Sequence, residues 1–147
     1  MAFGILAAYP GVPMLYAGDE ICLATIGPEY ARIPMPWTHP ERWEQRRVAT
    51  TRALFGARAK SVALQRGGLR WLWIGDDALA FLREAPDETV LVHAARADHP
   101  PIRIPAAAVG AELVGLAGAA DHQADADGMI TLPTAGPAFG MWRLSNG

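Results

Sequence analysis

Residues 69–96 read LRWLWIGDDALAFLREAPDETVLVHAAR, and this stretch decides which fold class the sequence predicts. Short runs rich in apolar, β-branched and aromatic residues are separated by Gly75-Asp76-Asp77 and by Pro86-Asp87. Gly, Pro and Asp at such positions are typical of turns, and runs of this length between turns are typical of β-strands. The stretch therefore predicts three neighbouring antiparallel strands, of which 89–96 is central.

The same pattern continues to the end of the chain. Further strand-like runs lie at 102–104, 112–116, 129–132 and 138–144. About seven strands at this spacing predict an antiparallel β-sandwich. We place its beginning after Arg66-Gly67-Gly68, where the period of the apolar residues changes, so that residues 67–147 form the second of two units.

Residues 1–66 predict a different kind of structure. Thr38-His39-Pro40-Glu41 has the features of a helix start, with Thr38 as cap and Glu41 in a capping box. A helix from there to Gly67 would have an apolar stripe at Val48, Thr51, Phe55, Ala59 and Val62. The apolar run 12–15 predicts a strand, which needs neighbours on both sides. We therefore expect exposed apolar surface in this unit, and either self-association through it or flexibility of residues 1–66.

Composition narrows the function classes. The 147 residues include 13 Lys and Arg and 15 Asp and Glu, for a net charge of −2, and only one Lys. No basic stripe is present, so nucleic acid is not an expected partner. The apolar N-terminus is broken by Pro10 and Pro13 and has no basic residue before it, so we expect neither a signal peptide nor a membrane span. The lone Cys22, expected to be small and buried, favours a reducing cytoplasm.

A search for catalytic and metal-binding motifs finds little. His-Glu-x-x-His, Gly-x-Ser-x-Gly, a Cys pair and a phosphate loop are all absent, and no metal or cofactor is expected. Asp121, Asp125 and Asp127 are interpreted as a turn between strands, because their register lacks the carboxylates of a calcium loop. His93 is expected to be packed in its strand. Trp71 and Trp73 are expected on one face, in the core or as a platform for sugar stacking.

Two motifs and the order of the parts carry a resemblance to a known family. GVPMLYAGDE at 11–20, preceded by Leu6, resembles the text Gly-x-Pro-x-x-Tyr-x-Gly-Asp/Glu-Glu of the α-amylase superfamily, glycoside hydrolase family thirteen. RIPMPW at 32–37 is similar to the Arg-x-Pro-Met-x-Trp segment that follows in many α-glucosidases. A closing helix, Gly-Gly and a β-sandwich with strands like 78–83 and 90–92 complete the resemblance, which covers almost the whole chain.

The resemblance implies a mixed fold: the last strand and helix of a (β/α)₈ barrel in 1–66, followed by an all-β antiparallel sandwich in 67–147. A whole barrel runs to about 250 residues, so this chain cannot contain one. Family members use an Asp nucleophile, a Glu acid/base and a further Asp in a retaining mechanism. All three would precede Met1, so no catalytic residue is expected here. The resemblance implies that Tyr16, Asp19 and Glu20 support the substrate pocket.

Arg32 is the residue that the resemblance assigns to substrate binding, beside the non-reducing-end sugar. A salt bridge that only holds the long loop is the alternative role. The function implied is that of the C-terminal part of a glycosidase acting on α-glucosidic bonds of maltooligosaccharides, α-glucosidase-like or neopullulanase-like, with the isolated chain inactive. The alternatives are a stand-alone sandwich that binds carbohydrate or another partner, and one half of a split enzyme completed by another polypeptide.

Overall fold

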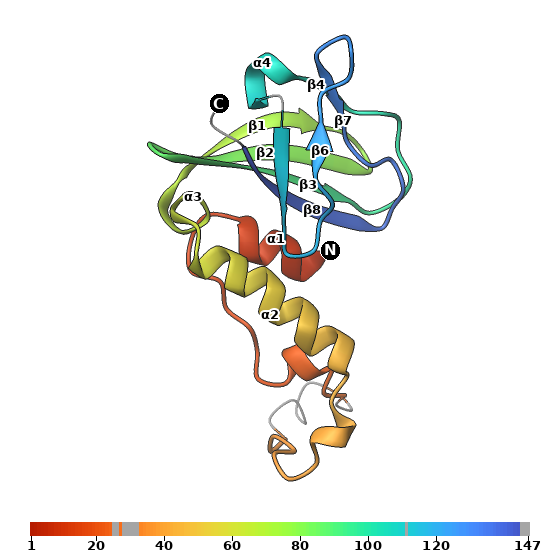
Figure 1. The fold of residues 1–147 in the computed structure, drawn as a ribbon. Helices are drawn as coiled ribbons and strands as arrows, with labels where there is room; N and C mark the ends of the chain where they lie inside the picture. The colour runs from red at the N-terminus through yellow and green to blue at the C-terminus, as the bar shows by residue number, and fades with distance from the viewer. Residues whose placement is uncertain (25–26, 28–32, 111, 145–147) are drawn as a thin grey trace.

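A computed structural model describes residues 1–24, 27, 33–110 and 112–144. Three layers are seen in Figure 1: helices below, a large antiparallel sheet in the middle, and a small sheet with a short helix above. The described helices are α1 (Ala2–Ala8), η1 (Asp19–Ile21), η3 (Pro40–Arg42), α2 (Gln45–Ala59), α3 (Val62–Arg66) and α4 (Ala106–Val109), where η denotes a 3₁₀-helix.

The strands confirm the antiparallel prediction and extend it. Six of them form one sheet in the order β1-β2-β3-β8-β5-β6, and β4 pairs with β7 in a second, two-stranded sheet. All recorded pairs are antiparallel. Their bounds are β1 (Gly68–Ile74), β2 (Ala78–Ala85), β3 (Glu88–Ala95), β4 (Arg103–Pro105), β5 (Glu112–Leu116), β6 (His122–Gln123), β7 (Met129–Thr131) and β8 (Ala138–Leu144).

One core lies between the two sheets. The alternation of side chains along β2, β3 and β8 places Leu82, Leu91 and Trp142 on the same face of the large sheet, in one row of paired residues. There they pack with Ile104 from β4 and Ile130 from β7. Trp142 is buried, and its Nε1–H donates to the carbonyl of Ala120 at 2.7 Å.

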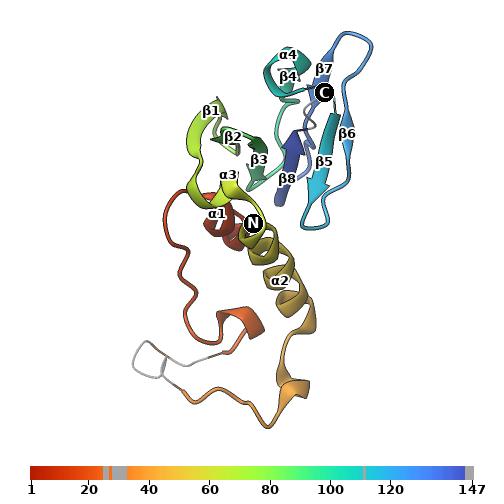
Figure 2. The same cartoon turned by 60° about the vertical axis from the view of Figure 1, so that its left-hand side comes forward.

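A second core joins the helices to the opposite face of the same sheet. The next row, Phe81, Val92 and Met141, packs against Leu54 of α2 and Leu64 of α3. Each such buried side chain contributes about 2 kcal/mol relative to an exposed one. Figure 2 shows α1 and α3 directly beneath the sheet, with α2 leading away from it. The helices of 1–66 and the sheet of 67–147 therefore share a core.

The helix start predicted at Thr38 is wrong. Pro40–Arg42 form only the 3₁₀-helix η3, and the Glu41 carboxylate lies 3.0 Å from the His39 ring rather than closing a capping box. The long helix begins at Gln45, because the Glu44 carboxylate accepts hydrogen bonds from the backbone N–H groups of Arg46 and Arg47.

The single helix expected up to Gly67 is also divided. Ser61 interrupts it and caps α3, its Oγ accepting from the N–H of Leu64 at 3.1 Å. The interruption changes the phase of the apolar stripe, so that Val62, expected inside, is 57 % exposed. Arg58, one turn before the break, is buried instead.

The strand predicted at 12–15 is not a strand in the structure. Residues 12–16 are extended, without ladder pairing to the described strands. A barrel strand is held by hydrogen bonds to neighbours on both sides, and the six-stranded sheet ends at β1 and β6 without reaching this segment. The described residues therefore contain no paired barrel strand. None of their helices has the length and hydrophobicity that a bilayer crossing requires.

Candidate functional site

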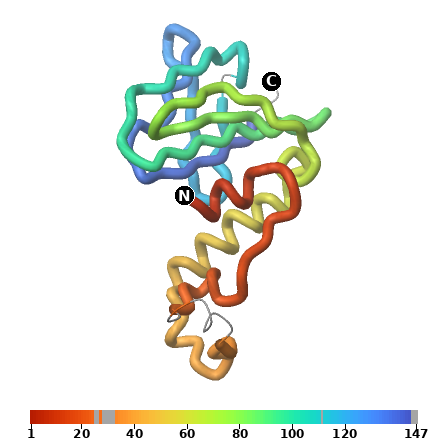
Figure 3. Tube along the Cα trace, turned by 180° about the vertical axis from the view of Figure 1, so that it is seen from behind, coloured from red at the N-terminus to blue at the C-terminus, as the bar shows by residue number. Residues whose placement is uncertain are grey.

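The segment that contains the predicted pocket residues begins where α1 ends. From Tyr9 it runs beside α2 toward the N-terminal end of that helix, where η1 packs against α2 (Figure 3). The carbonyl of Ile21 accepts a hydrogen bond from the N–H of Glu44 at 3.2 Å, and Ile21 is only 3 % exposed. Both ends of the segment are therefore attached to the helical layer.

Two buried arginines fix the start of this segment. The guanidinium of Arg58 donates to the carbonyls of Ala7 at 2.8 Å, Tyr9 at 3.1 Å and Gly11 at 2.5 Å. These carbonyls belong to the end of α1 and the residues after it, where no N–H group of the helix is available as a hydrogen-bond donor. Cations at this end are also favoured by the helix dipole. Burial lowers the pKa of Arg58 from its usual value.

Arg83 connects the same helix end to the sheet. It lies on β2, 1 % exposed, and donates to the carbonyls of Ala8, Gly67 at 2.8 Å and Gly68 at 3.3 Å. Burial first, and the nearby Arg58 charge second, lower the pKa of Arg83. The side chain of Arg83, which belongs to the sandwich unit, thus binds the C-terminal ends of both α1 and α3.

The carboxylates of Asp19 and Glu20 shape a turn. Asp19 Oδ2 accepts from the N–H of Tyr16 at 3.2 Å, and Glu20 Oε2 accepts from the N–H of Gly18 at 3.0 Å. Gly18 has φ +97°, and a Cβ there would lie 2.6 Å from the Cβ of Leu23. Glycine is therefore required, and the two acidic side chains support the backbone around it. Their role beside a substrate stays a prediction.

The apolar side chains before this turn face solvent. Val12 is 95 % exposed, Met14 79 % and Tyr16 48 %, as expected for a segment without strand neighbours. Cys22, expected to be buried, is exposed instead; it ends η1 in a left-handed conformation with φ 58°. Arg32, the predicted substrate-binding residue, lies outside the described residues.

A cavity of about 290 Å³ lies beside Glu20, and sequence reasoning missed it. Its wall includes Ile21 and the indoles of Trp37 and Trp43, whose ring centroids are 6.1 Å apart. Trp37 is 68 % exposed. The structure thus brings aromatic surface next to a predicted pocket residue. In the sequence, the only indication of this cavity was that Trp37 and Trp43 lie close to several prolines.

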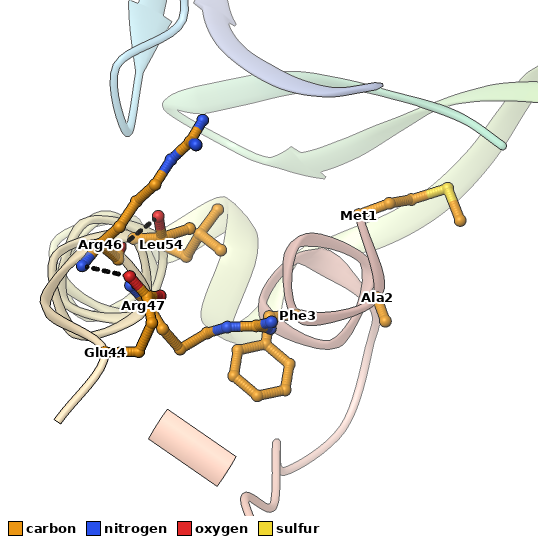
Figure 4. A pocket seen from close by; sticks show the side chains of 8 residues that line it. Met1, Ala2, Phe3, Glu44, Arg46, Arg47 and Leu54 are labelled. Atoms are coloured by element: carbon orange, nitrogen blue, oxygen red, sulfur yellow. Dashed lines mark hydrogen bonds between the residues drawn. The ribbon is translucent and has the colours of Figure 1, made fainter. Parts of the chain in front are cut away.

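A larger cavity, about 470 Å³, lies between α1 and the start of α2 (Figure 4). The guanidinium of Arg47 stands over the ring of Phe3, 5.1 Å from its centroid, and Arg46 extends toward the sheet. The Glu44 carboxylate that lines this cavity is occupied in capping α2. None of the predicted pocket residues lines it, so its size does not make it the candidate site.

The expectation that Trp71 and Trp73 share one face is wrong. A β-bulge shifts the register of β1, so Trp71 pairs with Phe81 while Trp73 pairs with Ala80. Phe81 and Ala80 point to opposite faces of β2, and paired residues share a face. Trp71 therefore lies on the helical side and Trp73 on the sandwich side. They are 42 % and 47 % exposed, so neither is the core residue expected.

His93 is packed in its strand as predicted, and it has a partner that the sequence did not indicate. It is fully buried, and its Nε2 lies 3.2 Å from Nε2 of His99, whose Nδ1 lies 2.8 Å from the carbonyl of Pro100. If His99 donates from Nδ1, His93 donates from Nε2 and its Nδ1 stays unprotonated. Burial first, and then the charges of His99 and His122, lower the pKa of His93 to about 4.

The acidic cluster is a turn, as interpreted. Asp125 accepts from the N–H groups of Asp127 and Met129 and pairs with Arg103 at 2.8 Å. Asp121 accepts from the N–H of Gly115. Among the residues that the structure describes, no group of three or more His, Cys, Asp or Glu side chains is placed to hold a metal ion.

No protein-family model and no curated protein sequence matches the chain. Solved structures do match it. An α-amylase from Anoxybacillus superposes with a TM-score of 0.85 and 23 % identity over 98 % of this chain. The α-amylase of Geobacillus thermoleovorans in complex with acarbose gives 0.84 and 20 % over 99 %. The fold is consistent with the C-terminal β domain of an α-amylase.

A third solved structure is also similar to the chain. The cyclic α-maltosyl-(1→6)-maltose hydrolase of Arthrobacter globiformis, in complex with that sugar, gives a TM-score of 0.66 and 26 % identity over 95 % of the chain. The chain spans only 31 %, 32 % and 29 % of the length of these three enzymes. The likeness therefore concerns about a third of an amylase-type enzyme, and the activity of the whole enzyme is a matter for proposal.

Proposed function

We propose that the chain is the C-terminal part of a retaining glycoside hydrolase that acts on α-glucosidic bonds of maltooligosaccharides. The proposal rests on how much of each chain is covered by the superposition on the Anoxybacillus α-amylase. The superposition covers 98 % of this chain but only 31 % of that enzyme. The motifs at 11–20 and 32–37 support a more specific assignment, to an α-glucosidase-like or neopullulanase-like enzyme.

In this proposal the catalytic carboxylates belong to a barrel portion that precedes Met1. A retaining mechanism needs a nucleophile and an acid/base whose carboxyl groups lie about 5 Å apart. Asp19 and Glu20 are already occupied as acceptors for backbone N–H groups, which favours a supporting role. Tyr16, Asp19 and Glu20 would form the rim of the pocket, and Arg32 would bind the substrate. The proposed location is the cytoplasm.

The chain alone is expected to be inactive on an aryl α-glucoside. The test is a chromogenic assay of the purified 147-residue chain, with the double variant Asp19→Asn/Glu20→Gln as matched control. We expect no turnover above background from either protein. Turnover near an ordinary enzyme's value of about 10 s⁻¹, lost in the double variant, would show that these carboxylates are catalytic and would overturn the proposal.

A second candidate is a sandwich that binds carbohydrate without an attached barrel. The half-exposed indoles of Trp71 and Trp73 favour it, because indole faces stack on the apolar face of a pyranose. Their placement on opposite faces of the sheet argues against a platform made by both. Sugar binding by a protein that exists only as the 147-residue chain would favour this candidate over the first.

A further inference from the structure

We propose that the sandwich unit has a glucosyl-binding site of its own, in the cavity between Trp73 and the loop residues His99 and Pro100. The cavity measures about 280 Å³ and is completed by the turn Gly75–Ala78. This is near the lower end of the volumes of small-molecule sites, which suits one sugar unit. The choice of an α-glucan as the ligand rests on the proposed function. The existence of the site rests on the features below.

The β-bulge is the reason that Trp73 lines this cavity. Without it, strand alternation would pair Trp73 with Leu79 and place it on the helical side with Trp71. With it, Trp73 pairs with Ala80 and lies on the face of the sheet that carries His93. Bulges at sheet edges commonly redirect a side chain toward a functional site, and β1 is an edge strand.

The walls of the cavity are held in place before any ligand binds. A Cβ on Gly75 would lie only 2.9 Å from Nε1 of Trp73, so the indole packs closely against this glycine. The imidazole of His99 is fixed on both sides, by His93 and by the carbonyl of Pro100. Trp73 nevertheless stays 47 % exposed. An indole that is already held in place, with about half of its surface exposed, loses little side-chain entropy when a sugar ring stacks on it.

The polar groups around the indole offer an acceptor to a ligand with hydroxyl groups. Asp77 is paired with Arg96, with 2.8 Å between Oδ1 and Nε. Asp76 is exposed and makes no side-chain hydrogen bond to the described residues. One unpaired carboxylate beside an indole can accept sugar hydroxyls while the ring stacks.

Maltotriose titration of the full chain tests the site. The indole N–H signals of the five Trp residues are followed by ¹H–¹⁵N NMR, and the signal of Trp73 is assigned by its loss in Trp73→Phe. We expect a saturable shift of this signal at millimolar maltotriose. We expect Trp73→Ala to weaken binding by about tenfold or more, and Trp71→Ala, on the other face, to leave it unchanged.

Two further variants keep the test decisive if Trp73→Ala unfolds. Gly75→Ala displaces the indole without removing it, and Asp76→Ala removes only an exposed carboxylate; each is expected to weaken binding severalfold. The site is overturned if no signal shifts at high maltotriose, if the shifts centre on Trp71 or Trp37, or if N-ethylguanidinium binds and sugar does not. Equal binding of cellotriose would confirm a sugar site but count against α-glucan as its ligand. Loss of the site would leave the proposed hydrolase function standing, because that function depends on the barrel portion.

Discussion

Replacing Arg83 with Met is expected to lower the free energy of unfolding by about 3 kcal/mol. The guanidinium is buried and serves three carbonyls, those of Ala8, Gly67 and Gly68. Met fills much of the same volume but offers no donor, so the carbonyls lose charged hydrogen bonds that water cannot replace in the interior. Urea denaturation followed by Trp fluorescence measures the loss.

Arg70→Met on the adjacent strand is the matched control. Arg70 is exposed, and its one ion pair with the described residues is with Glu84, at 2.7 Å, so its replacement is expected to cost less than about 1 kcal/mol. Equal effects of the two substitutions would contradict the conclusion that Arg83 joins α1 to the sheet. An increase in stability on replacing Arg83 would show that the cost of burying its charge exceeds the value of its hydrogen bonds.

Acidification is expected to destabilise the fold through His93. In the unfolded chain this imidazole has a pKa near 6.5, whereas burial and its His neighbours hold the folded pKa at about 4. Between these values the unfolded state binds more protons, so the free energy of unfolding falls as the pH falls from about 6.5 to about 4. Each pKa unit corresponds to about 1.4 kcal/mol, which gives a total loss of about 3 kcal/mol.

The pH dependence of unfolding in His93→Gln tests this assignment. Gln keeps a donor for His99 but does not titrate. Between pH 6.5 and 4 the free energy of unfolding of His93→Gln should therefore fall by about 3 kcal/mol less than that of the wild type. His39→Gln, at an exposed position, is the matched control, because it removes one imidazole without changing the surroundings of His93. Identical curves for His93→Gln and the wild type would refute the role of His93.

The strands were predictable because local information determines them. Alternation and turn residues located the runs that contain Leu82, Leu91 and Trp142, and the structure confirms that these runs are antiparallel strands. The bulge in β1 was not predictable, because the residue pattern of 69–74 is compatible with a regular strand. Only the pairing with β2 reveals that Trp73 has changed face.

Long-range contacts account for most of the other differences. In the sequence, Arg58 cannot be told apart from a solvent-exposed arginine on a helix. It is buried because the end of α1, about 50 residues earlier in the chain, presents carbonyl groups to it. The run 12–15 has a strand-like composition, but a strand exists only where partners pair with it. In the candidate site, Asp19 and Glu20 form a local turn, and their role beside a substrate stays a prediction. The Trp37 and Trp43 cavity depends on loop folding that no local pattern encodes.

The central claim is that this chain is about a third of an amylase-type enzyme, and the mass of the native polypeptide tests it most directly. Size-exclusion chromatography and intact-mass spectrometry on protein from cells that express the sequence provide that mass. We expect a polypeptide well above 15.7 kDa, or a firmly bound second polypeptide, because the proposed function places the catalytic carboxylates on a barrel portion, and a barrel runs to about 250 residues. A native 15.7 kDa monomer with no bound partner would contradict the account.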